Sequence, residues 1–435
     1  MLNTLSVWRG DILVDNKSQI EHSISQVRKR DGSVSDFNRD KILNAIHKAF
    51  SASNNPDKEI AAQLCDGVLA KLTEHGFSVN NPPSVESIQD LVESTLIDQG
   101  HSDIARTYIL YRHERRKIRD EKMRILNTKT LDSVAKAFDT NCLRVLASRY
   151  LFRDNKNEII EKPSELFERV AVLVTISDML RDNKLFSRDG KISKYVDEAT
   201  QYLTKLDDFN FKLKIGNYYL NKWHFRCIIN CYVDLAKQGK MKIPFKELLT
   251  MIASKKLDNY ADRISEYYEL MVSQDFLPNS PTMMNAGGRL GQLSACFVLG
   301  MPDDMTGIMK STSDAALIFK SGGGVGINYS DLREEGEIVA STSGVASGPV
   351  SFMNIINTVT DVIKQGGKRR GANMGIMEVW HPDIEKFITN KTKPGILENF
   401  NVSVGVWKDF WDVLVNTGDG KYTLHCPRDN SPARE

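Results

Sequence analysis

From residue 276 onward, short apolar runs alternate with longer amphipathic runs. The apolar runs are residues 296–299, 326–329, 374–379, 400–406 and 422–426, and each of the first four is followed by a segment with helical spacing. A chain that alternates strands and helices in this way forms a parallel sheet with helices packed on its faces. The pattern therefore predicts an α/β fold with five strands in this part of the chain.

A glycine-rich segment lies between the first helical run and the second strand of this pattern. Residues 320–328, KSGGGVGIN, hold four glycines within five positions. Neither GxxxxGK[ST] nor GxGxxG, two common phosphate-binding spacings, matches this segment. Glycine is required where the backbone adopts a positive φ or where another group approaches closely. A tight helix-to-strand connection explains one or two of these glycines but not readily four, which leaves open what approaches this backbone.

The part of the chain before this pattern is mainly helical. A hairpin is predicted at Asp31-Gly32, which separates two strand-like runs. Helices are predicted from Asn38 and over residues 58–72, 84–97 and 104–118. Residues 26–118 thus have the size of a domain. After a charged connector at residues 119–128, residues 130–275 are predicted to form a second, helical domain.

The composition is that of a globular protein. Of the 435 residues 41% are hydrophobic and 26% are charged, and the net charge is +2, so no nucleic-acid partner is predicted. The basic cluster at residues 112–119 is interpreted as a solvated helix face. Residues 1–25 are interpreted as an aperiodic leader without a signal-peptide pattern, and no run of ~18 apolar residues occurs. We therefore expect a cytoplasmic protein that does not enter the membrane.

The six cysteines are scattered and include no CxxC pair. Neither a secreted disulfide framework nor a zinc ribbon is therefore predicted. His224, Cys227 and Cys231 fall on one helix face and could in principle hold a metal ion, but the apolar residues beside them favour a core stripe. No metal site is predicted, and a functional cysteine is expected to be a redox or radical thiol.

Several segments occur in an order that points to one protein family. From residue 276 these are FLPNSPTMMNAG, LSACFVL, KSGGGVGIN, GVASGPVSFM and KQGGKRRGANMGIMEVWHPDI, and VRKRDG…DKI…AI precedes them near residue 27. The first group resembles the catalytic large subunit of ribonucleotide reductases, most closely the adenosylcobalamin-dependent class II enzymes. The segment near residue 27, VRKRDG…DKI…AI, resembles the ATP-cone that many of these reductases carry. The resemblance covers residues 26–118 and 140–426.

The resemblance implies an α/β architecture of three parts after the leader. Residues 26–118 would form a helical ATP-cone, residues 130–275 the helical N-terminal reductase domain, and residues 276–435 the first five-stranded half of a ten-stranded α/β barrel. The radical-bearing cysteine of the family lies in the second half, and its Asn-x-Cys-x-Glu pattern is absent from this sequence. We therefore expect the chain to need a C-terminal half, present as a separate chain or removed sequence, and to be inactive alone.

The resemblance assigns five residues to the reaction and its substrate. Cys296 matches the reducing cysteine, which donates electrons and forms a disulfide with a cysteine of the other half. Ser280 and Thr282 match the substrate-binding turn and would offer hydroxyl or amide donors to a diphosphate; capping of a proline turn is the alternative for either residue. Gly323 and Gly324 match the turn that lies against the ribonucleotide, where a side chain would occupy the substrate's volume.

Further residues match positions that bind nucleotide effectors. Asp303 and Arg333 match the specificity site, where the carboxylate would hold a deoxyribose hydroxyl and the guanidinium a phosphate; a surface ion pair is the alternative for Arg333. The loop 364–375 matches the loop that reads the effector on one side and the substrate base on the other. Its candidate contacts are Gln365, Lys368 and Arg370.

In the ATP-cone, the positions that contact ATP are matched by Val27, Lys29, Arg30 and Lys41. Cations on a short hairpin and at a helix start can bind a triphosphate. Ser35 stands where some cones carry Glu, which leaves the nucleotide preference and its effect open.

These assignments imply a class II ribonucleotide reductase. It would abstract the ribose 3′ hydrogen by a radical, release the 2′ hydroxyl as water and reduce the substrate with the cysteine pair. The implied cofactors and partners are adenosylcobalamin, ATP or dATP, dNTP effectors, a ribonucleotide substrate, an external dithiol from a thioredoxin-like protein and a second copy of the chain in a homodimer. The alternatives are a class I large subunit with a separate radical-generating small subunit, and a non-catalytic nucleotide sensor built on the cone.

Overall fold

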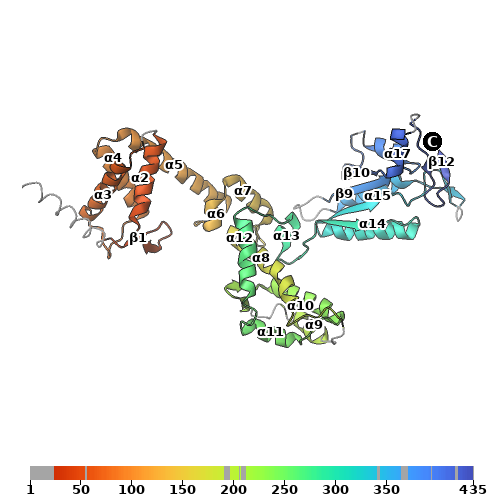
Figure 1. Cartoon of the computed structure of the whole chain (residues 1–435), viewed down its shortest axis with the longest axis horizontal. Coiled ribbons are helices and arrows are strands. Elements are labelled where there is room, and N and C mark those ends of the chain that lie inside the picture. The colour runs from red at the N-terminus through yellow and green to blue at the C-terminus, as the bar shows by residue number, and fades with distance from the viewer. Residues whose placement is uncertain are drawn as a thin grey trace, which may run out of the picture. The chain divides into compact units, whose positions relative to one another are not determined.

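The computed structural model describes residues 24–53, 56–190, 196–204, 206, 212–339, 343–363, 371–392, 394–416 and 420–434 (Figure 1). The chain divides into two compact units, Met1–Arg144 and Val145–Glu435. Residues 1–23 of the predicted leader lie outside the described residues, as do Gln365, Lys368 and Arg370. Within the described residues, no helix has an apolar stretch that could cross a membrane.

The first unit consists of a hairpin followed by helices. Its elements are β1 (Gln26–Arg28), β2 (Val34–Asp36), α2 (Arg39–Ala52), α3 (Lys58–Glu74), α4 (Val85–Asp98), α5 (Ser102–Ile125), α6 (Ser133–Ala137) and α7 (Thr140–Val145), which ends one residue beyond the unit. Helices α2, α3 and α4 begin where the side chains of Asn38, Asp57 and Ser84 accept hydrogen bonds from backbone N–H groups of the first turn. The predicted hairpin and helices are confirmed, but α5 continues to Ile125, so most of the predicted connector is helical.

The second unit begins with helices that enclose a core of its own. These are the π-helix η1 (Leu146–Tyr150), α8 (Pro163–Leu180), α9 (Val196–Thr204), α10 (Lys222–Lys237), α11 (Phe245–Ala253), α12 (Tyr260–Val272) and α13 (Ser280–Asn285), with a small hairpin of β3 (Lys214–Ile215) and β4 (Tyr218–Tyr219). Helix α8 buries residues on most of its circumference, as a helix in the centre of a bundle does. It packs against α10 and α12, and this confirms the predicted helical region.

The strands that follow form one parallel sheet. Its members are β5 (Cys296–Leu299), β6 (Gly324–Asn328), β9 (Asn373–Glu378) and β10 (Phe400–Gly405), in the spatial order β10-β9-β6-β5. The connecting helices are α14 (Met305–Lys320), α15 (Pro349–Val362) and α16 (Ile384–Thr389), the last extended by the 3-10 turn η2 (Asn390–Thr392), and α17 (Lys408–Asn416) follows β10. Each strand adds to the same side of the previous one, as in a barrel, whereas a doubly wound sheet reverses its order. The α/β class is thereby confirmed.

The predicted fifth strand does not join this sheet. Residues 424–425 form β11 (Leu424–His425), which pairs antiparallel with β12 (Pro432–Arg434). The chain reverses between them through Asn430, whose φ is +58°, and the backbone N–H of Cys426 donates to the carbonyl of Ser431. The five-stranded count is therefore wrong for the described residues, because a local turn supplies β11 with a nearer partner. A second small hairpin is formed by β7 (Ile338–Val339) and β8 (Gly344–Val345).

Candidate functional site

The hairpin of the first unit places cations beside helix α4. Gly32 has a φ of +83° in the turn between β1 and β2, a conformation that favours glycine. The Arg28 backbone N–H donates to the Pro83 carbonyl at 2.9 Å, which ties the hairpin to the segment before α4. The Arg30 guanidinium bonds the carboxylate of Glu86 and, at 3.1 Å, the amide oxygen of Gln89. Arg30 is thus held beside the start of α4, with its side chain 39% exposed.

Two adjoining cavities contain all four residues predicted to contact ATP. The larger, here called the cationic cavity, measures about 840 Å³ and is lined by Arg30 and Lys41. The smaller, here called the apolar cavity, measures about 310 Å³ and is lined by Val27, Lys29 and again Lys41. Its apolar wall consists of Val27, Phe37, Ile42, Val85, Ile88 and Val92. Since Lys41, Ala45, Gln89 and Tyr108 line both, the cavities share a wall.

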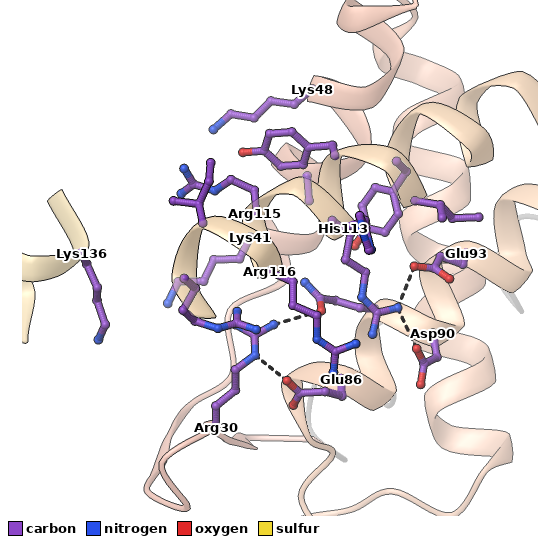
Figure 2. A pocket seen from close by; sticks show the side chains of 18 of the residues that line it. Arg30, Lys41, Lys48, Glu86, Asp90, Glu93, His113, Arg115, Arg116 and Lys136 are labelled. Carbon is purple, nitrogen blue, oxygen red and sulfur yellow. Dashed lines mark hydrogen bonds and ion pairs between the residues drawn. The ribbon is translucent and has the colours of Figure 1, made fainter. Parts of the chain in front are cut away.

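The cationic cavity holds a large excess of positive charge. Nine lysine or arginine side chains and three carboxylates line it. Figure 2 shows Lys41, Arg115 and Arg116 around the same space, and Arg30 paired with Glu86. Arg112 is engaged by Asp90 and Glu93 at 2.7 and 2.6 Å. The cations of the cavity outnumber its carboxylates, and this excess of positive charge suits a polyanion such as a triphosphate. Guanidinium groups bind phosphates through charge-assisted hydrogen bonds.

The cations that α5 contributes were not predicted as site residues. The sequence interpretation of residues 112–119 as a solvated helix face holds for Arg115 and Arg116, which are exposed, whereas Arg112 and Arg119 are half-buried. All four nevertheless line the cationic cavity. The sequence spacing of these arginines could have indicated that they share one face of α5. Tyr108, Arg112, Arg115 and Arg119 recur at helical intervals and therefore form one stripe of α5.

In the second unit, Cys296 is the first residue of β5 and its side chain is exposed. It lies in parallel register with Gly324, the first residue of β6. Strand β5 is the outer strand on its side of the described sheet, so Cys296 borders that edge. The predicted reducing cysteine and the glycine turn therefore lie side by side.

The chain's own packing accounts for three of the four glycines. Gly322 has a φ of +86°. A Cβ on Gly323 would lie 2.7 Å from Ile318 and 2.8 Å from the Phe297 ring, and one on Gly324 would lie 2.8 Å from the Ala372 carbonyl oxygen. On Gly326 a Cβ would make only ordinary contacts. A positive φ explains only Gly322, in line with the expectation for a tight connection, and close packing accounts for Gly323 and Gly324. The assignment of Gly323 and Gly324 to substrate stays a prediction.

Ser280 and Thr282 lie at the start of α13, in a turn capped by Asn279. The Asn279 side chain accepts from the Thr282 backbone N–H at 2.9 Å. The Ser280 hydroxyl contacts the Tyr150 hydroxyl at 3.1 Å, and the Thr282 hydroxyl donates to the Leu293 carbonyl at 3.1 Å. Neither the Ser280 nor the Thr282 hydroxyl caps the turn. The capping group is the side chain of Asn279, the residue before Ser280.

A buried arginine holds the α13 turn against the helical part of the unit. The Arg169 side chain is 5% exposed and donates to the carboxylate of Glu161 at 2.6 Å, whose side chain is 8% exposed. It also donates to the backbone carbonyls of Ala286 at 2.6 Å, Met283 at 3.1 Å and Tyr150 at 3.1 Å. The Arg169 guanidinium therefore links the α13 turn to the segment at Tyr150. These are the same two segments that the hydroxyl contact between Ser280 and Tyr150 joins.

His224 and its two neighbouring cysteines form no metal cluster among the described residues. His224 is buried, its Nε2 lies 3.0 Å from the Arg169 carbonyl oxygen, and its Nδ1 accepts from the Asn221 backbone N–H. Burial lowers the pKa of His224 to about 4, so the ring is neutral. The Sγ atoms of Cys227 and Cys231 are 3.8 Å apart and half-buried.

Asp303 and Arg333, the predicted specificity-site residues, bind each other. The Arg333 Nε donates to the Asp303 carboxylate at 2.8 Å, and its backbone N–H donates to the same carboxylate at 3.3 Å. The two side chains are 21% and 22% exposed. Asp303 follows β5 and Arg333 follows β6, so the pair lies at the carboxyl end of the sheet, opposite the end where Cys296 lies.

Three family descriptions match consecutive parts of this chain. The ATP cone domain matches residues 25–117, the all-alpha domain of ribonucleotide reductase residues 136–291, and its barrel domain residues 294–434. The cone, the helical domain and the barrel sheet described above occur in this order. Together they define the class of ribonucleotide reductase large subunits that carry an ATP cone.

Curated relatives agree with this class. The vitamin B12-dependent ribonucleoside-diphosphate reductase of Thermoplasma acidophilum is 42% identical over 399 residues, which cover 90% of this chain and 48% of the relative. The Mycobacterium tuberculosis protein of the same name is 31% identical over 414 residues, covering 93% and 47%. Subunit alpha of the Chlamydia muridarum ribonucleoside-diphosphate reductase is 25% identical over 443 residues, covering 86% and 42%. The chain belongs to the ribonucleotide reductase large-subunit family and spans about half the length of these relatives.

Proposed function

We propose that the chain is part of a ribonucleotide reductase that forms deoxyribonucleotides under nucleotide control. The observation that supports this most directly is the exposed thiol of Cys296, which begins a parallel strand in register with Gly324 of the glycine turn. A thiol at this place is open to a substrate bound along the turn. A ribonucleoside diphosphate is the proposed substrate, in keeping with the names of the relatives.

Cys296 would act as one of two reducing thiols. The pair gives two electrons and two protons and becomes a disulfide, while the oxygen of the substrate's 2′ hydroxyl leaves as water. An external dithiol, supplied by a thioredoxin-like protein, then restores both thiols by exchange. Ser280 and Thr282 would bind the diphosphate, and we expect their contacts with Tyr150 and the Leu293 carbonyl to exchange for contacts with the substrate.

Adenosylcobalamin is the proposed radical source, because the relatives from Thermoplasma acidophilum and Mycobacterium tuberculosis are named vitamin B12-dependent. A cobalamin carries its own cobalt, so this proposal requires no separate metal ligands from the chain. When bound, it would supply the radical that starts the reaction.

The cone would bind ATP or dATP across the two cavities of the first unit. The apolar cavity, walled by Val27, Phe37 and Ile42, suits an adenine ring, and the cationic cavity suits the triphosphate. Lys41 lines both cavities and would lie at the junction of the nucleoside and its phosphates. The 2′-deoxyribonucleoside triphosphates that set substrate preference would bind at Asp303 and Arg333, and Gln365, Lys368 and Arg370 would transmit the preference.

A chain with both Arg30→Ala and Lys41→Ala is expected to bind ATP more weakly by about 1.5–3 kcal/mol for each charge-assisted contact removed. Loss of Arg30 also leaves the Glu86 carboxylate unpaired beside the phosphates, which adds repulsion. Calorimetry on residues 1–435 measures the affinity. Lys58→Ala is the matched control, since Lys58 is exposed at the start of α3 and lines neither cavity. Unchanged affinity in the double variant would remove the cone assignment.

The proposed assembly is a cytoplasmic homodimer. Helix α14 carries three exposed apolar side chains, Met305, Met309 and Leu317, which are 63%, 50% and 63% exposed. They recur at helical spacing on one side of α14, and an apolar stripe of this kind is typical of a surface that another helix covers.

The activity is tested by complementation. Residues 1–435 alone are expected to form no deoxynucleotide from a ribonucleoside diphosphate, adenosylcobalamin and dithiothreitol. Addition of a polypeptide that corresponds to the part of the Thermoplasma relative outside its match with this chain is expected to give product. Product formation by residues 1–435 alone would contradict the proposal, and activity that needs a metal-containing small subunit instead of cobalamin would favour the class I alternative.

A further inference from the structure

The loop that carries Arg333 is fastened on both sides by two residues that follow strand β9. Before Arg333, the carbonyl oxygen of Leu332 lies 2.8 Å from Nε2 of His381. After Arg333, the backbone N–H of Glu335 donates to the carboxylate of Asp383 at 2.9 Å. Arg333 therefore lies between two fixed backbone positions three residues apart.

The histidine in this arrangement is held in one orientation. His381 is fully buried, and its Nδ1 accepts from the backbone N–H of Asp383 at 3.0 Å. Nε2 must then carry the hydrogen and donate it to the Leu332 carbonyl. The ring thus links the loop to the start of α16 through both of its nitrogens.

The same end of β9 holds the loop at an earlier point. The backbone N–H of Glu378, the last residue of β9, donates to the Ser330 hydroxyl at 2.7 Å. That hydroxyl in turn donates to the Asn328 side chain at 2.7 Å. The loop is therefore attached at Ser330 to the end of β9, and at Leu332 and Glu335 to the segment that follows β9.

We propose that His381 and Asp383 are positioning residues for the effector site: they fix the backbone around Arg333 so that its guanidinium stays beside Asp303 and can receive the phosphates of a 2′-deoxyribonucleoside triphosphate. A guanidinium binds phosphate through a fork of donors whose direction matters. A loop already ordered in the binding geometry also loses less conformational entropy when the ligand binds. The inference rests on the proposed assignment of Asp303 and Arg333 to an effector.

The test measures binding of dTTP and dGTP to residues 1–435, with ATP binding to the same samples as an internal measure of an intact first unit and the urea midpoint of tryptophan fluorescence as a measure of an intact second unit. His381→Leu and Asp383→Ala are expected to weaken dTTP and dGTP binding at least ~10-fold and to leave ATP binding unchanged. Asp383→Asn keeps an oxygen that can accept from the Glu335 N–H, so its affinity is expected to stay near that of the unmodified chain. Asp409→Ala, which removes a carboxylate bonded to Tyr422 elsewhere in the unit, is the matched control.

Hydrogen exchange gives a second measurement that does not depend on affinity. The amides of Leu332 to Glu335 are expected to exchange faster in Asp383→Ala than in Asp383→Asn. The inference is overturned if the unmodified chain binds dTTP or dGTP, Arg333→Ala abolishes that binding, and His381→Leu and Asp383→Ala both bind normally; the effector site itself then stands. Absence of dTTP and dGTP binding to the unmodified chain overturns both.

Discussion

Replacement of Arg169 by methionine is expected to lower the free energy of unfolding of the second unit by about 3–5 kcal/mol. The substitution removes the guanidinium and leaves the Glu161 carboxylate, which is 8% exposed, without its counter-charge. It also leaves the carbonyls of Met283 and Ala286 without the donors that hold the α13 turn. Urea denaturation followed by tryptophan fluorescence measures the loss, with Trp223 lying directly beside His224 on α10.

Two further variants show whether the buried charge causes this loss. Arg263→Ala breaks an exposed pair with Glu266, whose side chains are 51% and 60% exposed, and is expected to cost less than about 1 kcal/mol. Arg169→Met combined with Glu161→Gln removes the unpaired charge and is expected to recover part of the stability. If Arg169→Met unfolds at the same urea concentration as Arg263→Ala, the network does not stabilise the turn.

Replacement of Cys296 by serine is expected to abolish multiple turnovers in the complemented enzyme. Serine has nearly the same shape as cysteine but cannot form the disulfide that carries two electrons away from the pair. Since Cys296 is exposed at the start of an outer strand, the substitution removes no core packing, and ATP binding by the cone is expected to be unchanged. The measurement is deoxynucleotide formation with excess dithiothreitol.

Cys142→Ser is the matched control for this variant. Cys142 is a half-buried thiol on α7, outside the parallel sheet. Its substitution is expected to retain turnover. Turnover by Cys296→Ser at the rate of this control would contradict the role assigned to Cys296.

The elements whose signals are local were predicted well from the sequence. The turn at Asp31-Gly32 predicts the hairpin, and the helical spacing from Asn38 and over residues 84–97 predicts helices of the first unit; the structure confirms these elements. The first four strands of the barrel sheet follow equally from apolar runs separated by helices. In each of these cases the determining residues are neighbours in the sequence.

Features that depend on distant residues were predicted less well. The pairing of β11 is decided by a turn at Asn430 and by the N–H of His425, which donates to the Trp380 carbonyl. The glycine turn is explained by Phe297 of β5 and by the carbonyl of Ala372, the residue before β9. The arginines of α5 have the spacing of a single stripe, but only the fold shows that this stripe faces the hairpin cations across a cavity. Periodicity predicts which residues share one face of a helix, but it does not predict which other element that face lies against.

The most direct measurement of the central claim is the state of Cys296 after one turnover. The complemented enzyme is fully reduced, freed of external dithiol, allowed to react once with a ribonucleoside diphosphate, and then alkylated and analysed by peptide mass spectrometry. The account predicts deoxynucleotide in about equal amount to active chains and a Cys296 that resists alkylation until a reductant is added, because the thiol has entered a disulfide. Formation of the same amount of product with Cys296 still open to alkylation would contradict it.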